Sequence, residues 1–198
     1  MGGTSSVAVG GEHRVRLAVN SLIGAATGCW SQDAYHTAVV VDEFEYSFSP
    51  MGVVKQRLTS ATDCTLVEVG MSTMSGRQMT AILAPIFAPG SYDMLWKNCN
   101  TFSDCALFCL MGQRLDAKYR ALERVGAFLD DLTGAVRFLS MCRYKPNPKA
   151  REFDLVSVLR HIDCATRQQL PKSAVGERPI QYARAQRETD QGPQLTEI

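Results

Sequence analysis

Cys99 stands between two asparagines in the segment from Tyr92 to Ser103, where a loop is predicted to turn into a helix. The N-terminus of a helix carries unpaired backbone N–H groups and a partial positive charge. Both favour a thiolate over a thiol, and the N–H groups can stabilise an oxyanion as it forms. The position therefore predicts a cysteine nucleophile, and the alternative is a small, buried apolar residue.

His36 is the candidate general base. It lies near the start of a run of β-branched residues, and alternation along a strand places it on the same face as Ala38 and Val40. Such a histidine is either a hydrogen-bonded residue at a strand end or a base. As a base it would accept the proton of Cys99 and donate it to a leaving amine. His13 and His161 stand beside charged residues and are predicted to be solvated.

The chain has seven cysteines, an odd number with irregular spacing, which predicts free thiols in a reducing compartment. No pair is spaced C-x-x-C, so no structural zinc is expected, and nothing in the sequence implies a cofactor. Cys105 and Cys109 fall on the apolar stripe of a helix and are predicted to lie in the core. The cysteines stand at positions 29, 64, 99, 105, 109, 142 and 164.

Length and composition predict one compact domain with an appendage, because 198 residues with 45% apolar content can bury a single large core. The net charge of +1 disfavours a nucleic-acid partner. No apolar run approaches the ~20 residues that span a bilayer. We therefore expect a cytoplasmic protein, with the nucleus or a peripheral membrane site as alternatives.

The first residues fit the pattern M-G-x-x-x-[ST], which predicts N-myristoylation of Gly2 once Met1 is removed. The alternative is a flexible leader over residues 1–12. A single myristoyl chain binds a membrane only weakly, so membrane association through Gly2 alone is expected to be weak.

Two kinds of periodicity divide the chain, with strands in the first half and helices in the second. The predicted strands span residues 13–19, 35–41, 44–49 and 64–70, and the second and third are expected to pair antiparallel. Ser75 and Gln78 form a capping box before a helix that Pro85 should end. Further helices are predicted near residues 100–112, 117–142 and 153–162, the last docking back on the domain.

Three sequence features together resemble the PPPDE family of desumoylating isopeptidases, also called permuted papain-fold peptidases. They are Tyr35-His36-Thr37 with its β-branched continuation, the pair Glu45-Tyr46, and the string from Lys97 to Ser103. The resemblance implies an α+β, permuted papain-like fold, in which a small antiparallel sheet packs against the helix that carries the nucleophilic cysteine. It also implies a peptidase domain over 13–145. We expect a linker and accessory helix over 146–170 and a disordered tail over 171–198.

In the family, the matching residues act as a dyad without a required acidic third member, with Cys99 as nucleophile and His36 as base. The resemblance implies cleavage, through a thioester, of the isopeptide bond between a ubiquitin-like modifier and a lysine. The modifier, SUMO or ubiquitin, and its conjugated proteins are then the partners, and a homodimer is compatible with this reading. Two alternatives stay open: a protein S-acyl (palmitoyl) thioesterase with the same dyad, and a non-catalytic modifier-binding module.

The second oxyanion donor is the open point of this site. Asp93 stands where papain-type enzymes carry a glutamine, but an ionised carboxylate can only accept hydrogen bonds. Asn98 and Trp96 are the candidate donors, and the alternative for Asn98 is a cap of the following helix. The residues from Ser47 to Gly52 stand where a glycine-rich segment is usual in the family, which leaves the shape of the substrate groove open.

Overall fold

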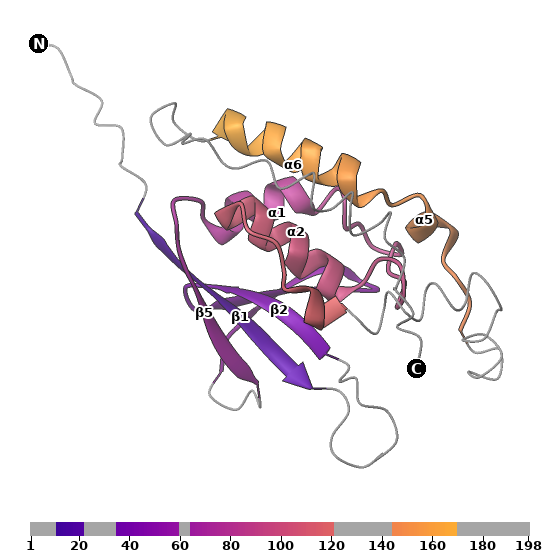
Figure 1. The fold of residues 1–198 in the computed structure, drawn as a ribbon, viewed down its shortest axis with the longest axis horizontal. Helices are drawn as coiled ribbons and strands as arrows, with labels where there is room; N and C mark the ends of the chain where they lie inside the picture. Colours follow the sequence, from indigo (N-terminus) through magenta and orange to yellow (C-terminus); the bar gives the residue numbers. More distant parts are fainter. Residues whose placement is uncertain (1–10, 22–34, 60–63, 121–143, 170–198) are drawn as a thin grey trace, which may run out of the picture.

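The computed structural model describes residues 11–21, 35–59, 64–120 and 144–169. Figure 1 shows a layered α+β domain, in which α1 (Gly76–Leu83) and α2 (Cys99–Met111) cover one face of a sheet and α6 (Leu155–Gln169) covers them in turn. Some predictions lie outside the described residues: lipidation at Gly2, the leader up to residue 10, the loop 22–32, most of the helix 117–142, and the tail 171–198.

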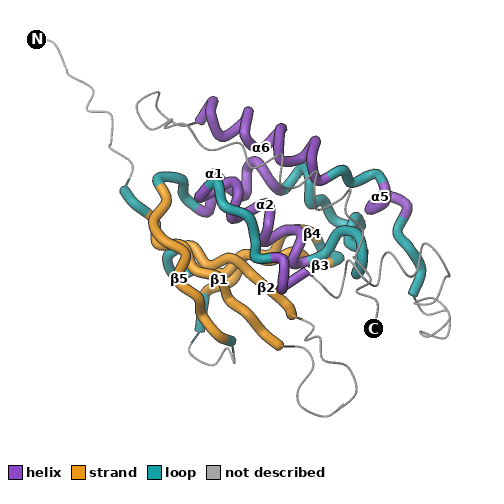
Figure 2. The backbone as a smooth tube through the Cα atoms, viewed as in Figure 1, coloured by secondary structure: helices purple, strands orange, loops and turns teal. Residues whose placement is uncertain are grey.

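The sheet has five strands in the order β4-β3-β2-β1-β5, and every neighbouring pair is antiparallel. The strands are β1 (His13–Ser21), β2 (Tyr35–Val41), β3 (Phe44–Ser49), β4 (Gly52–Arg57) and β5 (Thr65–Ser72). The four predicted strands and the pairing of β2 with β3 are confirmed (Figure 2). The sequence interpretation missed β4, because it treated Pro50-Met51-Gly52 as a break in the pattern. These residues form a tight turn instead, and Gly52 adopts a φ of 94° within it.

The two faces of the sheet differ in what they bury. Alternate residues of β1, β2 and β3 pack under the helices with at most 8% exposure: Val15, Leu17, Val19, Val39, Val41, Tyr46 and Phe48. The opposite face carries a smaller apolar cluster of Ala18, Ala38 and Val40. This alternation confirms that His36 shares its face with Ala38 and Val40.

α1 begins as predicted at a capping box. The Ser75 hydroxyl accepts from the Gln78 N–H at 3.3 Å, and the Gln78 side chain accepts from the Ser75 N–H at 2.9 Å. The helix ends at Leu83, just before Pro85. Gly76 allows a close approach of this helix to β3, because a Cβ there would collide with the ring of Tyr46.

The remaining helices complete the core. α2 is buried along its length from Cys99 to Leu110 and ends at Gly112, which adopts a left-handed φ of 68°. α6 packs on α2 and α1 and buries Leu159 and Ile162, so the predicted docking helix is confirmed.

Two shorter helices refine the predictions. The short α5 (Pro148–Arg151) begins within the predicted linker, and η1 (Ala117–Arg120) is a 3-10 helix where a longer helix was predicted to start. No helix among the described residues is both long and apolar enough to cross a membrane.

Candidate active site

Cys99 is the first residue of α2, and Asn98 caps the helix before it. The Asn98 side-chain oxygen accepts from the Thr101 N–H at 3.0 Å, while its backbone carbonyl accepts from the Phe102 N–H at 3.0 Å. No acidic side chain stands in the first turn to offset the positive end of the helix dipole. The predicted place of Cys99, at a helix N-terminus, is confirmed, and the residue is 8% exposed.

Asn100 joins the start of α2 to β2 on both sides of His36. Its side-chain oxygen accepts from the backbone N–H of Thr37 at 2.9 Å and from the Thr37 hydroxyl at 2.8 Å. Its amide nitrogen donates to the carbonyls of Tyr35 at 2.8 Å and Tyr119 at 3.0 Å. Asn100 is 1% exposed, so these bonds are shielded from water and fix the strand to the helix start.

The same amide oxygen brings the thiol to this strand. The Cys99 Sγ donates to the Asn100 Oδ1 at 3.8 Å, and that oxygen also takes the N–H of Thr37. β3 pairs with β2 only at residues 39–41, so residues 35–37 of β2 have no β3 neighbour, and the Asn100 amide bonds to two of them. The thiol of Cys99 and the backbone next to His36 therefore meet at one end of β2.

Burial lowers the pKa of His36 below its ordinary value of 6.5, and the carboxylate of Glu45 partly opposes this shift. Glu45 lies opposite Val40 in the β2–β3 pair and so faces the same side of the sheet as His36. A lowered pKa keeps the imidazole neutral near pH 7. Neutral imidazole is the form that a general base requires.

Comparison with known protein families bears directly on this arrangement. The family model of the "PPPDE putative peptidase domain" matches residues 7–133, which include both His36 and Cys99. The chain belongs to the PPPDE peptidase family. This match confirms the resemblance drawn from the sequence and assigns the domain to a cysteine-peptidase fold. A search of curated proteins found no match.

In this PPPDE domain, Asp93 shapes the loop that leads to Cys99. Its carboxylate accepts from the N–H groups of Leu95 at 2.8 Å and Trp96 at 3.1 Å. It also accepts from the Tyr144 hydroxyl at 3.0 Å and the Asn147 N–H at 2.8 Å. Asp93 is 3% exposed, and its carboxylate oxygens accept hydrogen bonds that hold this loop in place. This structural role explains why an aspartate stands where papain-type enzymes carry an oxyanion donor.

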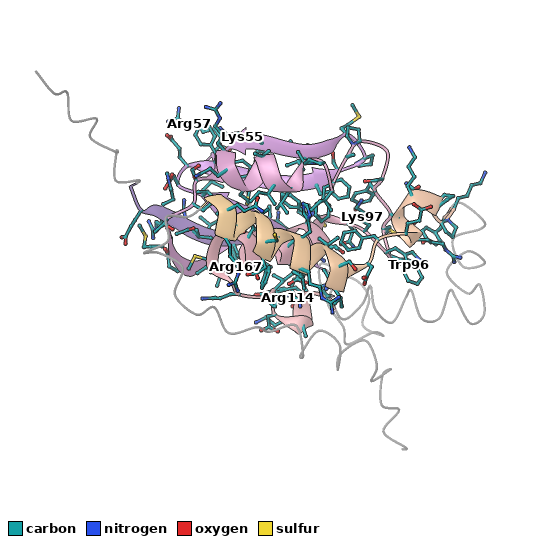
Figure 3. The ribbon with its side chains drawn as sticks, turned by 90° about the horizontal axis from the view of Figure 1, so that it is seen from above. Lys55, Arg57, Trp96, Lys97, Arg114 and Arg167 are labelled. Carbon is teal, nitrogen blue, oxygen red and sulfur yellow. The ribbon has the colours of Figure 1, made fainter. Side chains whose placement is uncertain are left out.

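Lys97 anchors the same loop from inside the PPPDE domain, a role that sequence reasoning missed. Its ammonium donates to the Ile86 carbonyl at 2.7 Å and to the Ser91 hydroxyl at 3.0 Å. It also lies 5.4 Å and 5.3 Å from the ring centroids of Phe87 and Phe153. Burial lowers the pKa of this amine. Figure 3 shows Lys97 directed into the body of the domain, and Trp96 on the side where α5 lies.

The two candidate oxyanion donors differ in what they bind. The Asn98 amide donates to the Met94 carbonyl at 2.8 Å while its oxygen caps α2, so the structure supports the cap interpretation. The Trp96 indole nitrogen is buried and has no hydrogen-bond partner within the described part of the chain. Because the Asn98 amide is engaged in the loop and the cap, Trp96 stays the prediction for the second oxyanion donor.

The other described cysteines of the chain differ from Cys99 as predicted. Cys105 and Cys109 are fully buried on α2, and burial raises the pKa of the Cys105 thiol. Cys64 and Cys164 are free as well. Cys29 and Cys142 lie outside the described residues. Among the described cysteines, only Cys99 begins a helix.

Proposed function

We propose that Cys99 and His36 form a catalytic dyad that removes a ubiquitin-like modifier from lysine side chains. The observation that carries this proposal is the Asn100 amide. It binds the strand on both sides of His36 and lies next to the Cys99 thiol. A nucleophile and a base need this kind of fixed proximity, because a misplacement of 1 Å can cost about 10²-fold in rate.

The reaction proceeds in two acyl-transfer steps. In the first, the neutral imidazole of His36 accepts the Cys99 proton as sulfur attacks the isopeptide carbonyl. The C–N bond then breaks, and His36 returns the proton to the leaving lysine amine. In the second, His36 takes a proton from water, the hydroxide attacks the thioester, and the C–S bond breaks. The modifier leaves with a free C-terminal carboxylate, and Cys99 regains its proton.

Each step passes through an oxyanion that needs hydrogen-bond donors. The backbone N–H of Cys99, at the positive end of α2, is one donor, and the Trp96 indole N–H is our candidate for the second. Loss of one such donor costs about 3 kcal/mol of transition-state stabilisation in comparable sites.

His36 reaches the thiol around the edge of β2. Thr37 bonds to the helix side, and alternation turns His36 toward the opposite face. The edge of β2 at residues 35–37 lacks a β3 neighbour, so an imidazole can approach Cys99 past this edge. The C-terminal tail of a modifier would approach the same end of β2.

Exposed methionines near the site offer apolar contacts to a modifier. Met94, in the loop before Cys99, is 53% exposed, and Met51, at the tip of the β3–β4 turn, is 80% exposed. That turn is fixed by a hydrogen bond from the Gly90 N–H to the Pro50 carbonyl at 3.0 Å. Methionine adapts to varied partner surfaces, which suits contact with a folded modifier.

Covalent capture tests the proposal. SUMO and ubiquitin, each carrying a C-terminal electrophile, are incubated with the wild type, with Cys99→Ser and with Cys164→Ser as a control at an exposed cysteine. A covalent adduct with either modifier is expected in the wild type and in Cys164→Ser, and none in Cys99→Ser. Turnover of an S-acyl substrate without capture would instead indicate a thioesterase, and binding unaffected by Cys99→Ser would indicate a non-catalytic module.

Activity is expected to fall along an acid limb centred below pH 6.5, because the pKa of buried His36 lies below that value. A protonated imidazole cannot accept the Cys99 proton, so the rate decreases as the pH drops through this pKa. Measuring kcat/KM from about pH 5 to pH 8 tests the position of this acid limb. An acid limb centred above pH 7 would show that His36 is protonated at neutrality and would contradict the neutral resting dyad.

A further inference from the structure

Asn20 lies directly opposite His36 in the β1–β2 pair. Residues directly opposite each other in an antiparallel pair point to the same face, with Cβ atoms about 4.5–5.5 Å apart. An asparagine side chain can therefore reach the imidazole ring across the strands. The sequence interpretation ended the first strand at Val19 and so left Asn20 out of the sheet, whereas β1 extends to Ser21.

The side-chain oxygen of Asn20 is buried and has no hydrogen-bond partner within the residues that the structure describes. Buried amide oxygens are almost always paired in folded proteins. The nearest candidate donor by register is the ring of His36, which carries an N–H in either neutral tautomer. An unpaired buried acceptor directly across the strands from a potential donor is a place where such a hydrogen bond can form.

We propose that Asn20 is a positioning residue, whose amide oxygen accepts a hydrogen bond from the His36 ring and holds the imidazole toward Cys99. This inference rests on the proposed function, because it gives the Cys99–His36 dyad a third, neutral member. A Cys-His-Asn arrangement recurs in papain-like proteases. Here the asparagine comes first in the chain, from the strand next to the histidine strand.

The chemistry follows from what an amide oxygen can do. It only accepts hydrogen bonds, so the ring nitrogen that faces it must carry a hydrogen. In a neutral imidazole the other nitrogen is then unprotonated and free to accept the thiol proton. Asn20 thereby selects the tautomer that can act as a base, without adding a charge to the site.

Other groups on this face of the sheet act on His36 in a different way. By register, Arg16, Glu45 and Glu68 share the face with His36. Arg16 donates to the Asp42 carbonyl, and Glu68 pairs with Arg14. The carboxylate of Glu45 is bonded to Gln56 at 3.1 Å. A charge at a distance shifts the pKa of a histidine but does not choose between its neutral tautomers.

The experiment measures the tautomeric state of the His36 ring by NMR of protein labelled with ¹⁵N in its histidine rings. The chain has three histidines, so His36→Gln assigns the signal. In the wild type we expect one dominant neutral tautomer of His36. In Asn20→Leu we expect a mixture of both tautomers and a fall in kcat of about 10-fold to 10²-fold, with a smaller change in KM.

Two further variants separate positioning from other effects. Asn20→Asp keeps the acceptor, so it should retain the single tautomer while raising the His36 pKa by about 1–3 units. Glu45→Gln should lower the His36 pKa and leave the tautomer unchanged. A tautomer that stays the same in folded Asn20→Leu overturns the inference. If the tautomer depends on Asn20 but the wild type cleaves no modifier conjugate, the positioning role holds and the proposed function fails.

Discussion

Asp104→Asn is expected to lower the free energy of unfolding by about 3–5 kcal/mol, because it removes a buried negative charge that pairs with two arginines. The Asp104 carboxylate is 1% exposed and forms a two-bond pair with Arg114, at 2.7 and 2.6 Å. It also accepts from Arg120 at 3.0 Å and from the Leu115 N–H at 2.9 Å. Asparagine has nearly the same shape but brings no negative charge to the two guanidinium groups that the carboxylate pairs with.

Urea unfolding followed by circular dichroism measures this effect, with Glu43→Gln as the matched control. Glu43 pairs with Arg57 at 2.6 Å, but both side chains are more than half exposed. An exposed pair contributes only about 0–1 kcal/mol, so the control should unfold close to the wild type. Equal losses in the two variants would show that burial does not strengthen the Asp104 cluster.

The cluster also has a structural consequence for the site. Asp104 lies in the same helix as Cys99 and ties it to the segment that contains η1. The Tyr119 carbonyl in η1 accepts from Asn100, one residue after Cys99. Arg114 and Arg120 therefore help to hold the part of the chain that contacts the N-terminal end of α2.

Local patterns made much of this fold predictable. The strands β1, β2, β3 and β5 follow from alternation or β-branched runs, and α1 follows from its capping box, since these signals depend on neighbours in sequence. β4 was missed because three of its residues, from Lys55 to Arg57, are polar and exposed, as befits an edge strand. Only the first half of β4 is buried or half-buried, with Val53 packed against the core, and this run is too short to show a strand period.

Only the parts of the candidate site that leave a signal in neighbouring residues could be predicted from the sequence. The position of Cys99 at a helix start was predictable because a cap residue and a helix start leave a local signature, and the position of His36 in a strand was predictable from the run of β-branched residues around it. The contacts of Asn100 and the position of Asn20 opposite His36 depend on strand pairing and register, which cannot be read from a single sequence. Likewise, two partners of the Asp93 carboxylate, Tyr144 and Asn147, lie about fifty residues away in the chain.

Asn100→Asp is expected to slow the reaction of Cys99 with a small alkylating agent by about 10²-fold, because it releases the strand that presents His36. The carboxylate can still accept from Thr37. However, it cannot donate to the Tyr35 and Tyr119 carbonyls, and it places buried negative charge against both oxygens. The same charge lies next to the thiol and disfavours the thiolate, so both effects act in one direction.

Peptide mapping of iodoacetamide-treated protein measures the rate at Cys99, and the exposed Cys164 serves as an internal reference in every sample. Thr37→Val provides a graded comparison, since it removes only the hydroxyl bond to Asn100 and keeps the backbone bond. Its loss of reactivity should be smaller than that of Asn100→Asp. If folded Asn100→Asp alkylates at the wild-type rate, the amide is a structural clamp alone, and the reactivity of Cys99 derives from the N-terminus of α2 without help from the histidine strand.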